Sequence, residues 1–163
     1  MFQKVEDVDW ANWDPRIRAT LLFVIRDGRI LLIHKKTGFG QGKISGPGGK
    51  IEPGETPEAC AIRETEEELC IKVSGVEYAG ELFFQFTDDN SIHGYVFTAT
   101  AFEGEPTETE EAAPIWSEID NLPFEHMWED DHTWFPYMLS GRRFSGRYVF
   151  DGDQMLDDVI ELD

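Results

Sequence analysis

The chain is poor in basic residues. It carries 14 Lys and Arg against 33 Asp and Glu, which gives a formal net charge of −19 over 163 residues. Proteins that bind DNA or RNA use a basic surface to neutralise the phosphate backbone. This charge balance therefore argues against a nucleic-acid polymer as the main partner. It is compatible with a small phosphorylated ligand, because a bound metal ion can supply positive charge.

Cysteines and long apolar runs are also scarce. The two cysteines, Cys60 and Cys70, would lie roughly 15 Å apart on one helix, whereas a disulfide requires a Cα separation below about 7 Å. We therefore expect free thiols in a reducing interior. No apolar run reaches membrane-spanning length, and the stretch MFQKVEDVDWANWD lacks the apolar centre of a signal peptide. These absences predict a cytoplasmic protein without a membrane partner.

The length predicts a single domain over residues 1–163, in which 1–16 form an irregular N-terminal extension. A hairpin is expected over 18–36 around Asp27-Gly28, followed by a glycine-rich loop. A helix should begin at Pro57, after the N-cap Thr56, and end near Leu69. A second helix within 128–139 should end or be interrupted near Pro136. This order predicts an α+β fold with a mixed sheet and helices packed on it, with further strands at 76–87, 93–102, 115–116, 147–152 and 155–162.

The first helix contains the stretch RETEEEL, residues 63–69, in which four of the seven residues are glutamates. At 100° per residue, Glu64, Glu67 and Glu68 share one face. The opposite face carries Ala59, Ile62 and Leu69, which we expect to pack on a sheet; Glu66 projects nearer that second face and serves as a spacer. Three carboxylates on one face suit a hard cation such as Mg²⁺. A solvated acidic face is the alternative, and these spacings alone do not separate the two.

The surrounding residues resemble the Nudix box, G-x5-E-x7-R-E-U-x-E-E-x-G-U, where U is apolar. The matching residues are Gly49, Glu55, Arg63, Glu64, Glu67, Glu68 and Ile71. Two positions depart from the pattern, because Thr65 replaces an apolar residue and Cys70 replaces the last glycine. The resemblance implies the Nudix fold, an α/β/α sandwich with a central mixed sheet and a loop-helix-loop motif. It also implies hydrolysis of a nucleoside diphosphate linked to a further group.

The resemblance also implies site roles. Mg²⁺, or Mn²⁺ in its place, would be bound by Glu64, Glu67 and Glu68, with a ligand from the Gly48 carbonyl. Arg63 would orient a glutamate through a fork to Glu55. Glu111, in the acidic loop, is similar to the late glutamate that joins the metal cluster, and Glu110 is the alternative. The catalytic set implied in this way is Arg63, Glu64, Glu67 and Glu111.

Three further stretches, KKTGFGQGKISGPGGKIEPGET, LPFEHMWEDDHTWFPYML and FSGRYVFDG, resemble the oxidised purine nucleoside triphosphatase (8-oxo-dGTP diphosphatase, MutT-like) branch. This likeness implies Mg²⁺-dependent hydrolysis of oxidised purine triphosphates to monophosphate and pyrophosphate, which sanitises the nucleotide pool. Ser45 stands where the branch has asparagine, and Pro47 where it has an aromatic residue. Substrate contacts are implied for Thr20, Lys35, Ser45, Gly49, Lys50, Trp128, Asp130 and Asp131.

The chemistry of three of these side chains also favours purine binding independently of the family resemblance. They are Trp128, Asp130 and Asp131. An aromatic face stacks on a base, and a carboxylate accepts from donors on a guanine edge. When two carboxyl groups lie close together, one of them should have a raised pKa. The protonated one can then donate a hydrogen bond to a base oxygen. The alternative is a solvated helix turn beside a tryptophan in the core.

Two other functions stay open. One is Nudix hydrolysis of a nucleotide sugar or dinucleoside polyphosphate, and the other is a catalytically silent nucleotide sensor. In each case the partner is a small nucleotide, and the protein is expected to be a monomer or homodimer.

Overall fold

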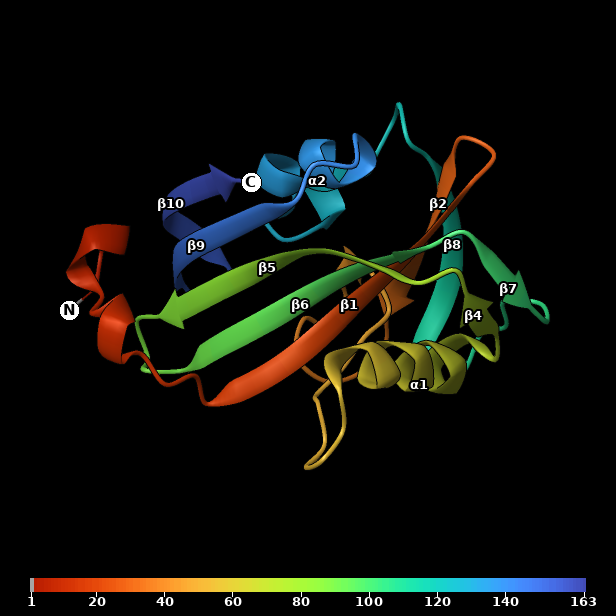
Figure 1. The fold of residues 1–163 in the computed structure, drawn as a ribbon, viewed down its shortest axis with the longest axis horizontal. Helices are drawn as coiled ribbons and strands as arrows, with labels where there is room; N and C mark the ends of the chain where they lie inside the picture. Colours follow the sequence, from red (N-terminus) through yellow and green to blue (C-terminus); the bar gives the residue numbers. More distant parts are fainter. Residues whose placement is uncertain (1) are drawn as a thin grey trace.

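The computed structural model describes residues 2–163. The fold is built on one large mixed sheet with a helix on each face (Figure 1). The helices are α1 (Pro57–Leu69) and α2 (Asp131–Leu139), and there are short 3-10 helices at η1 (Val5–Asp7), η2 (Trp10–Asn12) and η3 (Phe124–His126). The strands are β1 (Ile17–Arg26), β2 (Arg29–Lys35), β3 (Ile44–Ser45), β4 (Lys72–Ser74), β5 (Glu77–Phe86), β6 (Ser91–Ala99), β7 (Ala101–Glu103), β8 (Ala112–Glu118), β9 (Phe144–Asp151) and β10 (Gln154–Leu162).

The large sheet has the strand order β10-β9-β5-β6-β1-β2-β3, and β8 pairs with the other edge of β2. The pairs β1–β6 and β5–β9 are parallel, and the others are antiparallel. Strands β1 and β2 pair only beside their turn, where Ile25 faces Ile30 and Arg26 faces Arg29. Beyond that point the two strands separate, and the glycine-rich loop fills the gap. Its carbonyls at Pro47 and Gly49 accept hydrogen bonds of 2.9 Å from β1.

Two apolar cores lie on opposite faces of this sheet. The core on the α2 side is built around Trp134, Phe135, Phe23 and Tyr148. The core on the α1 side contains Leu69 together with residues of β1, β2 and β6. Figure 1 shows α1 below and α2 above the sheet. The predicted α+β class and its α/β/α layering are therefore confirmed.

Helix α1 begins and ends where the sequence predicts. The Thr56 hydroxyl accepts from the Ala59 amide at 3.1 Å, and Pro57 occupies the first helical position. The predicted packing face is wrong in part, because Ala59 is exposed. The buried residues are instead Cys60, Ala61, Thr65, Glu68 and Leu69. The burial of Thr65 is possible because its hydroxyl donates to the Ala61 carbonyl at 2.7 Å, which satisfies the polar group.

Cys70, which replaces the usual glycine, takes the left-handed conformation with φ 62° and ψ 28°. Its backbone N–H still donates to Glu66, so the helix ends in the turn that glycine normally forms. Both cysteines are free thiols, as expected. The departure from the Nudix pattern at Cys70 therefore leaves the end of the helix unchanged in shape.

Helix α2 contradicts the predicted break near Pro136. The helix continues through Pro136 to Leu139. A proline inside a helix loses its own N–H bond and crowds the carbonyl four residues earlier. Its carbonyl still accepts, and the Ser140 amide donates to the Pro136 carbonyl at 3.1 Å, so the helix continues. Pro136 is exposed, whereas Trp134, Phe135 and Met138 are buried. Burial of that apolar face offsets the cost of the proline.

The strands follow the predicted order, with three differences. Strand β8 covers seven residues and pairs along all of β2, where only a short strand was expected. The expected strand at 93–102 divides after Ala99, and its end forms β7, which pairs with β4. Residues 2–16, where an irregular extension was expected, contain the two short 3-10 helices η1 and η2. Within residues 2–163, every helix is too short or too polar to cross a membrane.

Candidate active site

A cleft opens where β1 and β2 separate, between the glycine-rich loop and the N-terminus of α2. One end is aromatic, and the other end reaches α1. The aromatic end is lined by Phe39, Phe84, Phe86, Trp128 and Phe150, with Ile92, Asp130 and Asp131. The other end is lined by Thr20, Lys35, Ser45, Gly48, Gly49 and Glu68.

Three carboxylates meet at the α1 end. Glu64, Glu68 and Glu111 each offer an oxygen, and these atoms lie within 4.8 Å of one another. Glu64 and Glu68 are one helical turn apart, and Glu111 directly precedes β8. The Lys36 amide holds the Glu111 carbonyl at 2.9 Å. An all-oxygen set of this kind fits Mg²⁺ or Mn²⁺. Glu110, the alternative to Glu111, lies outside this group.

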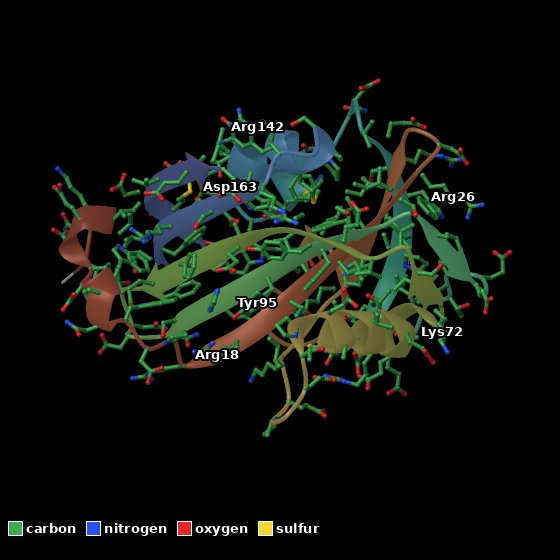
Figure 2. All side chains as sticks on the ribbon, viewed as in Figure 1. Arg18, Arg26, Lys72, Tyr95, Arg142 and Asp163 are labelled. Carbon is green, nitrogen blue, oxygen red and sulfur yellow. The ribbon has the colours of Figure 1, made fainter. Side chains whose placement is uncertain are left out.

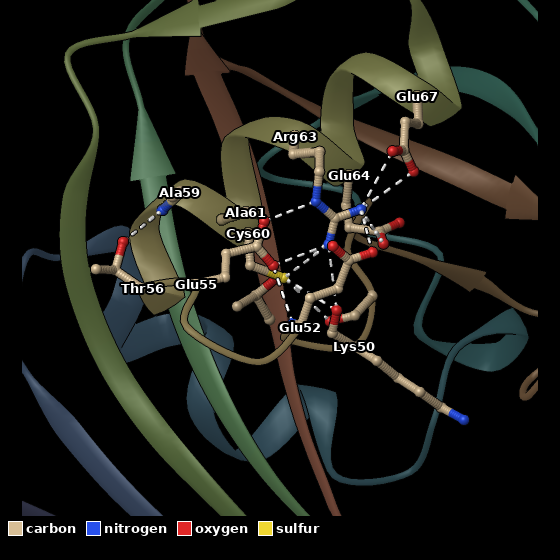
Figure 3. Close-up of polar contacts among 12 residues, drawn as sticks. Lys50, Glu52, Glu55, Thr56, Ala59, Cys60, Ala61, Arg63, Glu64 and Glu67 are labelled. Carbon is tan, nitrogen blue, oxygen red and sulfur yellow. Dashed lines mark hydrogen bonds and ion pairs between the residues drawn. The ribbon is translucent and has the colours of Figure 1, made fainter.

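Arg63 donates hydrogen bonds to three glutamates of the Nudix box, Glu55, Glu64 and Glu67 (Figure 3). Its Nε and Nη2 donate to the two Glu55 oxygens at 2.7 and 3.0 Å, which is the predicted fork. Its Nη1 donates to Glu64 at 2.9 Å and to Glu67 at 3.2 Å. These bonds to Arg63 lower the pKa of Glu55 to about 2. Glu67 has a half-exposed side chain and lies outside the Glu64–Glu68–Glu111 group, although the family pattern places it among the ligands.

The environment of two of the three carboxylates, Glu64 and Glu68, disfavours negative charge. Burial raises the pKa of Glu68 to about 7, although the Gly48 amide donates to its Oε1 at 2.9 Å. Burial also raises the pKa of Glu64. Carboxyl groups held close together in a partly buried place gain from a cation that neutralises them. The three donors therefore fit a divalent metal better than they fit a merely solvated acidic face.

Gly48 and Gly49 allow this close approach. A Cβ at Gly48 would lie 1.8 Å from the Thr20 carbonyl oxygen. A Cβ at Gly49 would lie 2.4 Å from the carboxyl carbon of Glu64. Any side chain at either position would displace β1 or the glutamate, so the two glycines are needed because there is no room for a Cβ.

At the aromatic end, Asp130 and Asp131 are both buried. The Trp134 indole donates to Asp130 Oδ2 at 2.8 Å, with Trp134 itself in the core. Burial raises the pKa of Asp130 to about 6. Burial, and then the charge of Asp130, raise the pKa of Asp131 well above its usual value. The pair therefore favours one carboxylate beside one carboxylic acid, and the alternative of a solvated turn is wrong.

Trp128 forms a wall of the cleft and is only partly buried. Phe39 stacks on it with ring centroids 5.1 Å apart and an interplanar angle of 17°. Lys43 Nζ lies 4.9 Å from the Trp128 ring centroid. Lys43 and Phe150 were not among the residues predicted from the sequence. The signal for Lys43 was a basic residue within the glycine-rich loop. The signal for Phe150 was the alternation of side chains between the two faces of β9.

Of the other predicted substrate residues, four line the cleft and one does not. Lys35, Ser45 and Gly49 line the cleft. Thr20 contributes to the lining, but its hydroxyl lies 3.4 Å from Cys60 Sγ on the α1 side, and only 2% of the residue is exposed. Lys50 is exposed and lies outside the lining, and Figure 3 shows its side chain pointing away from Arg63.

Comparison with known proteins agrees with this geometry. The model of the NUDIX domain matches residues 15–138. An oxidized purine nucleoside triphosphate hydrolase from Danio rerio is 42% identical over 149 residues, covering 88% of this chain and 96% of the relative. The protein of that name from Mus musculus is 40% identical over 139 residues, covering 84% and 89%. A MutT protein structure from Bacillus halodurans matches with a TM-score of 0.79 at 27% identity, covering 89% of this chain and 97% of that one. Motif, fold and relatives agree, and the chain belongs to the NUDIX family.

Proposed function

We propose that this protein hydrolyses oxidised purine nucleoside triphosphates to the monophosphate and pyrophosphate, and so sanitises the nucleotide pool. One observation carries the proposal. A single cleft is lined at one end by Glu68 of the Glu64–Glu68–Glu111 group and at the other end by the buried Asp130–Asp131 pair. A triphosphate and a base linked through a sugar need these two environments in one continuous site. The names and similarity of the two animal relatives support the same substrate class.

At the α1 end, Glu64, Glu68 and Glu111 would hold the Mg²⁺, and Mn²⁺ would fit the same oxygens. When bound, the cation neutralises phosphate charge and lowers the pKa of a coordinated water. Arg63 keeps Glu55, Glu64 and Glu67 in place through charge-assisted hydrogen bonds. Glu111 and Glu67 are the candidates to accept the proton of the attacking water at a carboxylate oxygen.

At the other end, the two aspartates bind the base edge. Asp131, as the protonated partner, donates to a base oxygen, while the Asp130 carboxylate accepts from a base N–H. Both groups are buried, so a mismatched base would leave a buried polar group unpaired. Trp128 and the phenylalanines supply stacking area.

A second candidate follows from Ser45 and Pro47, which replace the asparagine and the aromatic residue of the purine branch. This departure favours another nucleoside diphosphate derivative, such as a nucleotide sugar or a dinucleoside polyphosphate. A silent sensor is disfavoured, because a protein that only binds nucleotides has no need of the Arg63 network and the three clustered carboxylates.

Turnover of a nucleotide panel by the wild type and Glu67→Gln tests the proposal. The panel contains oxidised and normal purine triphosphates, a nucleotide sugar and a dinucleoside polyphosphate, each with Mg²⁺. We expect the wild type to prefer a purine triphosphate, and Glu67→Gln to lose turnover by about 100-fold or more while still binding nucleotide. Glu66→Gln, on the exposed side of the same helix, is the matched control. No turnover of any purine triphosphate by the wild type would refute the proposal.

A further inference from the structure

We propose that the N-terminal segment, residues 2–16, positions the base end of the cleft from the opposite face of the sheet. The inference rests on the proposed nucleotide cleft and assigns a role to residues that lie outside the Nudix box. In Figure 1 the segment, drawn in red, lies at the end of the sheet formed by β5, β6 and β9. These strands carry four of the residues that line the base end.

The segment contacts one row of neighbouring residues across these strands. Gln85 of β5 pairs with Ser91 of β6 and with Val149 of β9. The Arg16 amide donates to the Ser91 hydroxyl at 2.9 Å, and the Trp13 indole donates to Gln85 Oε1 at 2.9 Å. Val149 packs in a small apolar cluster with the segment's valines at positions 5 and 8. Each member of the row therefore has its own contact with the segment.

The cleft residues are the sequence neighbours of this row. Phe84 and Phe86 flank Gln85, Ile92 follows Ser91, and Phe150 follows Val149. Successive side chains of a strand point to opposite faces. The row therefore faces the N-terminal segment while its neighbours face the cleft. A shift of the row moves the aromatic walls of the base site with it.

Gln85 is the centre of the arrangement. Only 6% of it is exposed, and its Nε2 donates to the carbonyls of Phe86 at 2.9 Å and Asn90 at 3.2 Å. These two bonds hold the turn between β5 and β6. Its Oε1 depends on Trp13 as the hydrogen-bond donor. Loss of that donor would leave a buried oxygen unpaired, and the amide would have to move or admit water.

The segment itself is well fixed. The Trp10 indole donates to the Val5 carbonyl at 2.9 Å, and the Val5 amide donates to Asp157 of β10 at 2.8 Å. Trp10 and Trp13 have ring centroids 5.1 Å apart, and Trp13 meets Phe83 of β5 at 5.8 Å. Arg147 of β9 lies over the Trp10 ring. The segment is therefore anchored on both sides of the Gln85 row.

The test is Trp13→Phe in the full chain, which keeps an aromatic ring and removes the indole N–H. We expect KM for purine triphosphates to rise about threefold to tenfold with kcat within about twofold, because ground-state binding is lost while the metal end is untouched. Gln85→Met should give the same change, and the double variant should add little to either one, because both remove one interaction. Asn12→Ala is the matched control, since Asn12 is exposed and bonds only to Asp9 within its own segment.

A second readout needs no turnover. Amide hydrogen exchange of nucleotide-free protein should accelerate at residues 84–86 and 91–92 in Trp13→Phe and stay unchanged in Asn12→Ala. A lower melting temperature with unchanged KM and unchanged exchange at these residues would overturn the inference. Absence of turnover in the wild type would refute the proposed function instead, and the exchange result alone would then decide the positioning role.

Discussion

The two ends of the cleft crowd carboxyl groups in different ways. At the α1 end, Glu64, Glu68 and Glu111 approach within 4.8 Å of one another, beside a partly buried arginine that donates to five glutamate oxygens. At the α2 end, Asp130 and Asp131 are enclosed with an indole N–H as the hydrogen-bond donor to the pair. Like charges in a confined site are costly in both places. The first group suits neutralisation by a cation, whereas the second suits neutralisation by a proton.

This difference assigns the two ends to different parts of one substrate. A cation-binding group suits the polyphosphate, because metal ions bridge carboxylates and phosphate oxygens. A carboxylic acid beside a carboxylate suits a base edge, which presents donors and acceptors but no full charge. Substitutions that remove one negative charge from either end should therefore have distinct effects on turnover, binding and the response to Mg²⁺.

The largest effect is expected from Glu68→Gln. Removal of one oxygen ligand should lower kcat by at least roughly 100-fold. Even a residue that only hydrogen-bonds to a metal ligand can cost about 100-fold when it is replaced. The same change should abolish the rise in melting temperature that Mg²⁺ causes in the wild type, because ligand binding to the native state is the source of that rise. Steady-state kinetics and thermal melts with and without Mg²⁺ measure both.

The control for Glu68→Gln is Glu66→Gln, which removes an exposed carboxylate from the same helix. This variant should keep the wild-type kcat and the Mg²⁺ shift. Equal loss of the Mg²⁺ shift in both variants would show that overall helix charge, and not a defined site, binds the cation.

An intermediate effect is expected from Asp131→Asn. The amide cannot reproduce the pattern of one acid beside one carboxylate, so kcat/KM for guanine-type triphosphates should fall about 10- to 100-fold. The Mg²⁺ shift in melting temperature should persist, because the α1 end is intact. Nucleotide kinetics and Mg²⁺ melts on the same variant check this. Equal proportional losses of stability and activity would mean that Asp131 is only structural.

The stability of Asp131→Asn should also depend on pH. The folded pKa of Asp131 is raised above its ordinary 3.8 by burial. Its contribution to stability is therefore full below that value and is lost as pH rises through the folded pKa. Asparagine does not titrate, so the variant should gain stability relative to the wild type as the pH rises from about 4 through the folded pKa of Asp131. Urea unfolding of both proteins at the two ends of this range measures the change. A difference in the free energy of unfolding between variant and wild type that does not vary with pH would contradict the prediction.

The smallest effect is expected from Cys70→Gly, outside both ends of the cleft. Cys70 is exposed and left-handed, with φ 62°. Glycine takes this conformation without strain, so the free energy of unfolding should rise by up to about 1 kcal/mol. Cys70→Ala keeps the Cβ and should change little. Kinetics should be unchanged in both, and a stability gain for alanine equal to that for glycine would point to the thiol and not to the backbone.

Local spacing made part of this structure predictable. The bounds of α1 and the Arg63–Glu55 fork depend on residues close in sequence. The adjacency of Asp130 and Asp131 predicted a raised pKa, although burial is its largest cause. Three features were not predictable in this way: the exposure of Ala59, the side of β1 on which the Thr20 hydroxyl lies, and the position of Lys50. They depend on how the glycine-rich loop crosses β1 and on which strand meets the helix, and such long-range contacts leave no short periodic signal.

The N-terminal segment shows the same limit. Trp10 and Trp13 lie in a polar stretch without periodicity, which favoured an irregular extension. Their partners, Gln85 and Phe83, are about seventy residues further along the chain. Only the folded sheet brings them together, so neither the anchored segment nor its link to the base site was visible in the sequence.

The most direct test of the central claim is conversion of 8-oxo-dGTP by the wild type, Glu68→Gln and Asp131→Asn, measured side by side with Mg²⁺ and with identification of the products. The two-ended cleft predicts that the wild type releases the monophosphate and pyrophosphate, that Glu68→Gln loses kcat, and that Asp131→Asn loses kcat/KM chiefly through a higher KM. No conversion by the wild type, or wild-type kinetics in both variants, would contradict it.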